Sequence, residues 1–247
     1  MSESSETVPA ELHHDHRDVT GGWLRPAVFG VMDGLVSNFA LMAGVAAGSA
    51  SLSLTDAAAR TSVILAGIAG LAAGAFSMAA GEYTSVASQA ELARAEIEIE
   101  RLELERRPEA EMAELAGLWE SRGLDHDLAV EVARQLTRDP EKALEVHSRE
   151  ELGLTLADLP SPWVAAGSSF GSFAVGAMIP VIPYLAGALT IVPSMIASMA
   201  ALFGVGVLVS QVTSRTWWYA GTRLLIIGSL AAGLTWLVGH LVGVGVG

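Results

Sequence analysis

The chain has 247 residues, of which 51% are hydrophobic, and its mean hydropathy of +0.46 is rarely reached by soluble globular proteins. It contains no cysteine, which excludes disulfides, thiolate metal sites, iron–sulfur clusters and cysteine nucleophiles. Most of the net charge of −13 lies between Glu82 and Asp158, where 20 residues are acidic and 9 are basic, and such a block repels nucleic acid and attracts cations or basic partners.

Residues 1–26 are polar and acidic, so we expect a mobile tail and no cleaved signal peptide. The tail contains a cluster that could bind metal, formed by His13, His14, Asp15 and His16. A mobile segment without supporting outer ligands makes a poor metal site.

The first membrane span is predicted over about Ala27–Gly48, since about 20 apolar residues cross a bilayer. Asp33 is the only charged residue in this run. A carboxylate inside a span is costly and is seldom kept for stability, so Asp33 is predicted to be an ion or proton site. Ser37 and Asn38 offer further oxygens about one turn away. The alternative role for Asp33 is an interhelical hydrogen bond.

The second span is predicted over about Ser62–Tyr83, and residues 27–86 together hold the first two membrane spans. No glycine or proline stop follows, so we expect one helix that leaves the membrane and runs to about Arg107. Met78 and Glu82 lie four residues apart on it, where a soft thioether and a carboxylate at the membrane edge could both meet a passing ion. The alternative for Met78 is ordinary packing.

An acidic helical insert is predicted over 87–159. After the end of the long helix, residues that favour helix starts and helix ends divide the insert into three shorter helices. These residues are Pro108, Gly123, Asp125, Asp139–Pro140 and Gly153.

Acidic side chains recur at helical spacing in this insert. Glu96, Glu100 and Glu103 share one face of the long helix, because residues four and seven apart are neighbours. Oxygen ligands with one imidazole suit Mn²⁺, Fe²⁺, Co²⁺ or Zn²⁺. Glutamates on solvated helices are common, but few here have a lysine four residues later, so like charges stay close. By spacing, the candidate ligands are Glu96, Glu100 and Glu103 on the long helix, Glu111 and Glu114 on the next helix, and His147 and Glu151 on the last helix of the insert.

Three further spans are predicted in 160–247. The 54 residues of Ser161–Ser214 carry no charge and fit two spans, with a break near the segment IPVIPYLAG (179–187), where Pro180 and Pro183 can end or kink a helix. The fifth span is expected over about Thr222–Val242. An interfacial aromatic belt precedes it, formed by Trp217, Trp218 and Tyr219.

The predicted fold class is therefore all-α, a polytopic membrane protein with five transmembrane helices and a helical insert between spans two and three. Arginines lie in the tail, in the insert and before the last span, whereas the opposite loops hold only Arg60. The positive-inside rule then predicts that the N-terminus and the insert are cytoplasmic. Glycine pairs such as Gly30/Gly34 allow close helix contact and favour tight packing and a dimer.

Several separate motifs resemble the vacuolar iron transporter family. In chain order, from about Asp18 to the last span, they are MDGLVSNFALMAGV, AGAFSMAAGEY, the glutamate helix, REELGL and AMIPVIPYLAGAL. The resemblance implies a five-span homodimer that exports Fe²⁺ or Mn²⁺ from the cytosol in exchange for protons. It also implies a translocation carboxylate at Asp33 and a methionine partner at Met78. The metal ligands that it implies in the insert are Glu100, Glu103, Glu111, Glu114 and Glu151, together with His147 at the position of a further family ligand.

The chain departs from the plant members of that family at two positions. His147 stands where they have a methionine ligand, which makes metal binding more pH-dependent. Gly70 stands where they carry a glutamate in the second span, and Glu82, one turn past Met78, is the candidate substitute.

We therefore expect a divalent-metal/proton antiporter of a bacterial plasma membrane, with metal ions, protons and the lipid bilayer as partners. It is expected to be no enzyme, and it has no Walker A motif for ATP-driven transport. No prosthetic group and no nucleic acid are expected. The alternatives are a membrane-bound metal sensor and a ferroxidase, neither of which needs a carboxylate buried in a span. Ligand chemistry leaves the order of Fe²⁺ and Mn²⁺ open.

Overall fold

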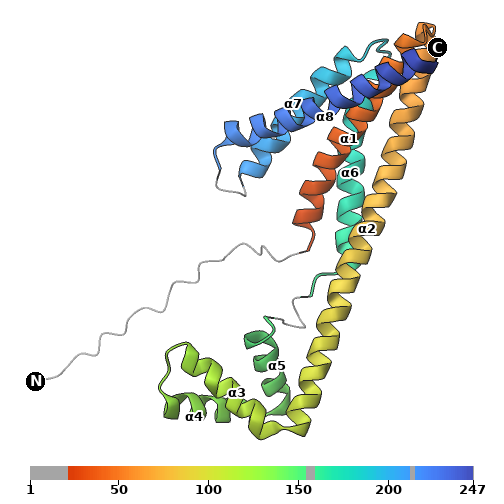
Figure 1. Cartoon of the computed structure of the whole chain (residues 1–247). Helices are drawn as coiled ribbons and strands as arrows, with labels where there is room; N and C mark the ends of the chain where they lie inside the picture. Colours follow the sequence, from red (N-terminus) through yellow and green to blue (C-terminus); the bar gives the residue numbers. More distant parts are fainter. Residues whose placement is uncertain (1–21, 154–158, 212–214, 247) are drawn as a thin grey trace, which may run out of the picture.

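The computed structural model describes residues 22–153, 159–211 and 215–246 (Figure 1), so the histidine cluster at 13–16 lies outside the described residues. Within these ranges all regular structure is helical, as the sequence predicts. The helices are α1 (Leu24–Ser51), α2 (Asp56–Arg106), α3 (Pro108–Ser121), α4 (His126–Leu136), α5 (Pro140–Glu150), α6 (Pro162–Leu185), α7 (Val192–Ser210) and α8 (Trp217–Val246). Five of them, α1, α2, α6, α7 and α8, are long and apolar enough to cross a membrane.

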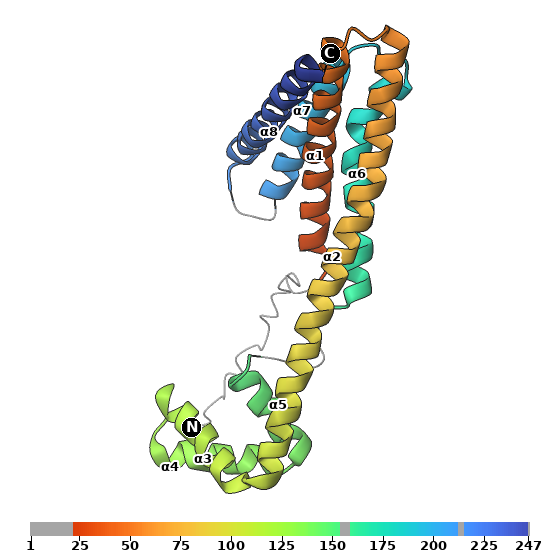
Figure 2. The same ribbon diagram turned by 45° about the vertical axis from the view of Figure 1, so that its right-hand side comes forward.

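Helix α2 joins the membrane helices to the acidic insert without a break (Figures 1 and 2). It begins where the Thr55 side chain accepts a hydrogen bond from Ala58 N, and it ends at Arg106, two residues before Pro108. Proline disfavours the helical conformation of the residue before it, and Arg107 has left that region, with φ −137° and ψ 50°. At about 1.5 Å per residue, its 51 residues span roughly 75 Å, more than twice a hydrocarbon core of about 30 Å.

The structure gives the bounds of the membrane helices in the C-terminal half. Pro180 and Pro183 both lie inside α6, and neither ends it. Helix α6 ends at Leu185, within the predicted segment 179–187, and Gly187 follows with a φ of +103°, which suits a residue just past a helix end. Helix α8 begins at Trp217, so the three residues of the predicted aromatic belt form its first turn.

Helix α1 is central among the membrane helices and packs against α2, α6, α7 and α8. Glycines allow its closest contacts. A Cβ at Gly176 of α6 would lie 2.2 Å from the Val31 carbonyl oxygen, and a Cβ at Gly239 of α8 would lie 2.0 Å from that of Gly44. Toward the loop that joins them, α7 and α8 diverge from α1, which leaves part of α1 uncovered (Figures 1 and 2).

The insert folds back on the far end of α2. Helices α3, α4 and α5 share an apolar cluster formed by Leu115, Ala116, Ala133 and Val146. Helix α5 also packs against α2. This packing places polar residues of α5 next to glutamates of α2.

The close contact between α1 and α8 predicts that Gly239→Ala destabilises the protein by about 1 to 3 kcal/mol, since the added methyl forces backbone to shift. Gly233→Ala on the same helix is the matched control, because a Cβ there has no neighbour within 4 Å among the described residues. Thermal unfolding of the full chain in detergent checks this. Equal unfolding temperatures for the two variants would contradict the proposed packing.

Candidate metal site and polar residues of the membrane helices

His147 of α5 is the centre of a buried polar group in the insert. Its side chain is 0% exposed, and its Nδ1 lies 3.1 Å from Glu100 Oε1 of α2 and 2.9 Å from Glu151 Oε1. Glu151 follows α5 directly and is one turn from His147, so both side chains lie on the face of α5 that packs on α2.

The facing atoms of this group are not satisfied by one another. Both ring nitrogens of His147, Glu100 Oε1 and Glu151 Oε1 are buried without a hydrogen-bond partner among the described residues. These atoms therefore lie close together, although no hydrogen bond of normal geometry joins them. Buried polar atoms nearly always have hydrogen-bond partners. Nitrogen and oxygen atoms that lack such partners and lie at this spacing could instead act as ligands of a cation.

A second group of carboxylates shares Glu100. Ligand atoms of Glu100, Glu103 and Glu111 all lie within 4.8 Å of one another, and the same holds for Glu100, His147 and Glu151. The shared glutamate places two potential ion positions side by side, between α2, α3 and α5.

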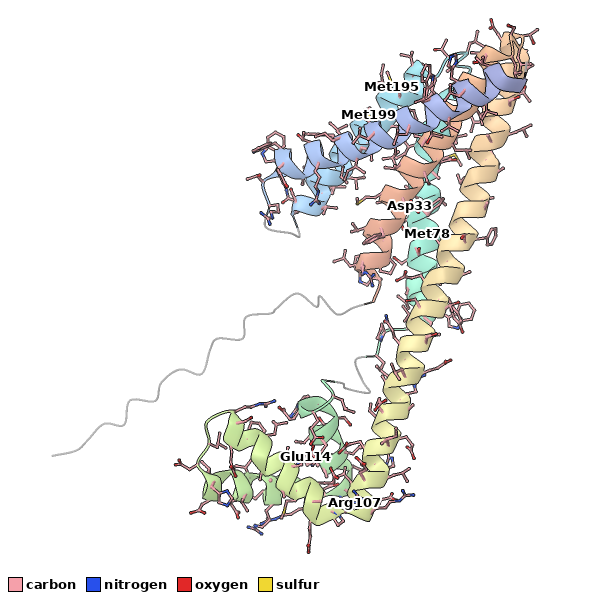
Figure 3. The ribbon with its side chains drawn as sticks, in the orientation of Figure 1. Asp33, Met78, Arg107, Glu114, Met195 and Met199 are labelled. Atoms are coloured by element: carbon pink, nitrogen blue, oxygen red, sulfur yellow. The ribbon has the colours of Figure 1, made fainter. Side chains whose placement is uncertain are left out.

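Glu114 lies beside these groups without belonging to either. It is exposed, on the side of α3 that faces α5 (Figure 3), and its charge raises the pKa of both Glu111 and Glu151. Glu96, which shares a face with Glu100 by spacing, is exposed and outside both groups.

Burial and mutual repulsion raise the pKa of three of these carboxyl groups. The pKa of Glu151 rises from 4.5 to about 7, first because of burial and then because of Glu114, Glu111 and Glu103. Burial is also the largest cause of the raised pKa of Glu100 and of Glu111. A raised pKa in the fold means that stability from these groups is present at low pH and is lost as pH rises, for Glu151 through about 7. A bound cation would reverse this loss.

In the membrane helices, the structure separates Asn38 from Asp33. Asp33 and Ser37 lie on an exposed face of α1, where the Ser37 hydroxyl donates to the Asp33 carbonyl oxygen at 2.5 Å. Asn38 is five residues after Asp33, about 140° around the helix, and points inward. Its Nδ2 donates to the carbonyl oxygens of Gly67 (3.1 Å) and Ala177 (2.7 Å). The prediction that Asn38 adds an oxygen beside Asp33 is therefore wrong.

Asp33 lies on the face of α1 that α8 covers only further along. Gly44, on the same face, contacts Thr235 of α8, whereas α8 has diverged at the level of Asp33 (Figures 1 and 3). The carboxylate has no hydrogen bond or ion pair among the described residues. The interhelical hydrogen bond that was its alternative role is thus not formed within this part of the chain.

Met78 packs against the cluster of Ala75, Phe173 and Ala177, which is the contact set of a core residue, and Glu82 is half-buried one turn further along α2. The glycine at position 70 also has a structural reason. A Cβ there would lie 2.6 Å from Asn38 Oδ1, so any side chain at this position requires Asn38 to move.

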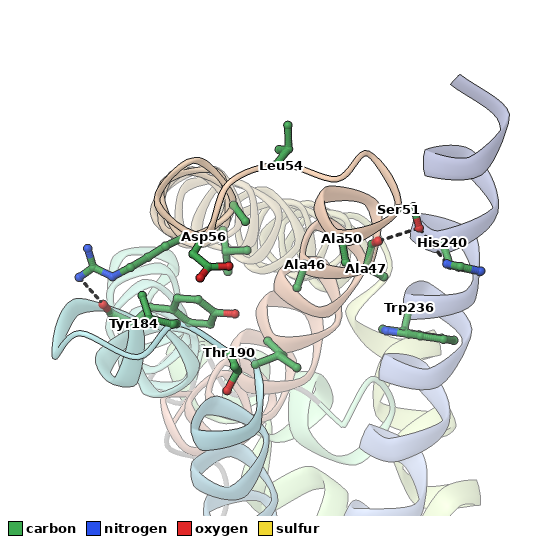
Figure 4. Close-up of a pocket in the computed structure, with 15 residues that line it drawn as sticks. Ala46, Ala47, Ala50, Ser51, Leu54, Asp56, Tyr184, Thr190, Trp236 and His240 are labelled. Carbon is green, nitrogen blue, oxygen red and sulfur yellow. Dashed lines mark hydrogen bonds between the residues drawn. The ribbon is translucent and has the colours of Figure 1, made fainter. Parts of the chain in front are cut away.

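Sequence reasoning missed a cavity of about 540 Å³ at the end of the membrane helices remote from the insert (Figure 4). On one wall Ser51 Oγ lies 2.8 Å from His240 Nδ1, and on the other Arg60 donates to the Tyr184 carbonyl oxygen at 2.8 Å. These contacts join residues more than 120 positions apart, and no local pattern indicates them.

The VIT family model matches residues 24–240. The chain belongs to the VIT family. It is 30% identical to vacuolar iron transporter 1 of Arabidopsis thaliana, over 93% of this chain and 90% of that protein. It is 35% identical to the vacuolar iron transporter of Acanthamoeba castellanii, over 75% of this chain and 67% of that protein. Family membership and the five apolar helices identify an integral, multi-pass membrane protein.

The cluster predicts that Glu100→Gln lowers the number of divalent ions bound by the full chain, whereas Glu96→Gln, the matched control on the same helix, leaves it unchanged. Affinity for Mn²⁺ should fall about tenfold from pH 8 to pH 6, because the proton on Glu151, with its pKa of about 7, competes with the ion. Titration calorimetry at both pH values measures both effects. Unchanged stoichiometry in Glu100→Gln would remove this residue from the site.

Proposed function

We propose that the protein exports Fe²⁺ or Mn²⁺ from the cytosol in exchange for protons. The observation that supports this most directly is the buried group of Glu100, His147 and Glu151. Its potential ligand atoms lie close together and have no hydrogen-bond partners among the described residues. Its position at the end of a helix that continues into the membrane supports a role in supplying ions to the membrane helices. The names of the relatives, vacuolar iron transporters, support transport of iron in particular.

The insert would collect ions through the two ligand groups that share Glu100, with Glu114 adding negative charge beside them. Carboxylates and one imidazole suit Fe²⁺ and Mn²⁺ equally and do not rank them. Each bound ion would displace protons from groups with raised pKa, so loading falls at low pH. An ion collected here would enter a membrane path without any prosthetic group or enzymatic step.

Asp33 would serve as the exchange site in the membrane. A single carboxylate can hold either a proton or a cation, and competition between the two is the minimal requirement for antiport. Met78 and Glu82 would form the neighbouring part of the path on α2. A sensor or a ferroxidase needs no carboxylate at this depth, which favours transport over both.

A homodimer would cover the surface on which Asp33 lies. Helices α1 and α2 expose large apolar side chains there and elsewhere, among them Phe29, Leu65 and Phe76, each more than 60% exposed. We place the N-terminus and the insert in the cytoplasm of a bacterial cell, with the protein in the plasma membrane, on the basis of the arginine distribution.

Asp33→Asn should abolish proton-coupled flux and leave ion binding by the insert intact, because the amide keeps the shape of the side chain but cannot exchange a proton. Fe²⁺ uptake into proteoliposomes under an imposed pH gradient, without oxygen, measures this, with internal pH recorded in parallel. Asp127→Asn, the same change on the exposed first turn of α4, is the control and should transport normally. Wild-type rates in Asp33→Asn would reject the exchange mechanism.

The proposed orientation predicts that a cysteine at Ser121 does not react with a membrane-impermeant thiol reagent in intact cells. A cysteine at Ala57, on the first turn of α2 at the opposite end of the membrane helices, should react. The native chain has no cysteine, so labelling reports only the introduced site. The reverse pattern would place the insert outside the cell.

A further inference from the structure

Helix α6 is weakened within the membrane by its own sequence. Pro180 and Pro183 lie inside the helix and have no backbone N–H, so the carbonyl groups of Gly176 and Ile179 lose their usual intrahelical donors. A helix with two such positions one turn apart bends more readily than its neighbours. The segment 177–184 is therefore the point at which α6 can change shape with least loss of hydrogen bonding.

Side chains from three other helices donate hydrogen bonds to this same segment. Asn38 of α1 donates to the Ala177 carbonyl oxygen at 2.7 Å, and Ser194 of α7 donates to that of Pro180 at 2.7 Å. Arg60 of α2 donates to the Tyr184 carbonyl oxygen at 2.8 Å (Figure 4). In each contact the acceptor is a backbone carbonyl of α6. The three hydrogen bonds together therefore fix the position of the helix itself.

These hydrogen bonds lie in apolar surroundings. Val181 and Tyr184 are buried in a cluster with Met42 of α1 and Val63 of α2. Asn38 and Ser194 are themselves 2% and 0% exposed, so water does not readily replace their contacts. The three hydrogen bonds all lie within one short segment of α6, and each is either formed or broken. A transition between two packed states requires contacts of this kind.

We propose that Asn38, Arg60 and Ser194 are positioning residues for transport, which hold the proline segment of α6 in one of two positions that it occupies as an ion crosses. The inference rests on the proposed transport function and assigns these residues no contact with the ion. Arg60 and Tyr184 also line the cavity at the end remote from the insert, so release of their contact would reshape that cavity (Figure 4).

Ser194 allows the sharpest test, because threonine and valine have the same shape and differ in the hydroxyl group. Ser194→Val should lower the maximal rate of Fe²⁺ uptake into proteoliposomes by about threefold relative to Ser194→Thr, the ratio that one average interhelical hydrogen bond in a membrane protein represents. The KM should be the same in both variants, because no ion ligand changes.

Ser198 supplies the matched control. It lies one turn further along α7, is also 0% exposed, and its hydroxyl has no hydrogen-bond partner among the described residues. Ser198→Thr and Ser198→Val should therefore have equal maximal rates. Hydrogen exchange of the α6 segment 177–185 in detergent should be faster in Ser194→Val than in Ser194→Thr, which links the kinetic change to this helix.

Equal maximal rates in the Ser194 pair, or a difference of the same size in the Ser198 pair, would overturn the inference and leave the proposed transport function standing. Wild-type vesicles that move no Fe²⁺ would instead contradict the proposed function itself. Should the Ser194 variants fail to fold, Arg60→Lys and Arg60→Met form a second pair, of which only the lysine variant keeps a donor for Tyr184. Equal rates in that pair would reject the proposal in the same way.

Discussion

Burial of several carboxylates around one imidazole is the constraint on which the insert depends. Glu100, Glu111 and His147 are buried where two groups of ligand atoms meet, and the attraction of Arg107 to Glu111 is the smallest of the influences on that glutamate. Ionised carboxylates without partners are costly to bury, and here the cost is expressed as raised pKa values. A divalent cation would remove the repulsion and satisfy the unpaired atoms in one step.

The same constraint explains how the insert is joined to the membrane helices. Glu100 is on α2, whereas His147 and Glu151 belong to α5 and its end, so a bound ion would tie α5 to a helix that continues into the bilayer. In the membrane, close glycine contacts fix α1 between α6 and α8 up to the point where α8 diverges. Asp33 lies at that divergence, open on one side, while the inward-facing Asn38 holds α1 to α2 and α6.

Local signals in the sequence predict the helices well. Hydropathy gives five spans, and the missing stop after Tyr83 gives the unbroken α2. Pro108, Gly123 and Pro140 give the divisions of the insert, because each acts on the backbone within one or two residues. The ligand groups are predictable in part, since helical spacing places Glu100 with Glu103 but also includes Glu96, which packing leaves exposed.

Contacts between distant segments are not predictable in this way. The direction of Asn38 follows from the helices that surround α1, and its partner Ala177 is 139 residues away. The hydrogen bonds that α1, α2 and α7 donate to the α6 backbone near Pro180 and Pro183 likewise follow from packing, and no local pattern in α6 reveals them. Local sequence alone leaves open whether these prolines end the helix or lie within it.

We propose that the insert holds a divalent ion between α2 and α5. Anomalous diffraction from crystals of the full chain grown with Mn²⁺ tests it most directly. We expect an anomalous peak between Glu100, His147 and Glu151, with a second one beside Glu103 and Glu111. Well-ordered side chains at these positions with no peak between them, in crystals that show Mn²⁺ elsewhere on the protein, would contradict it.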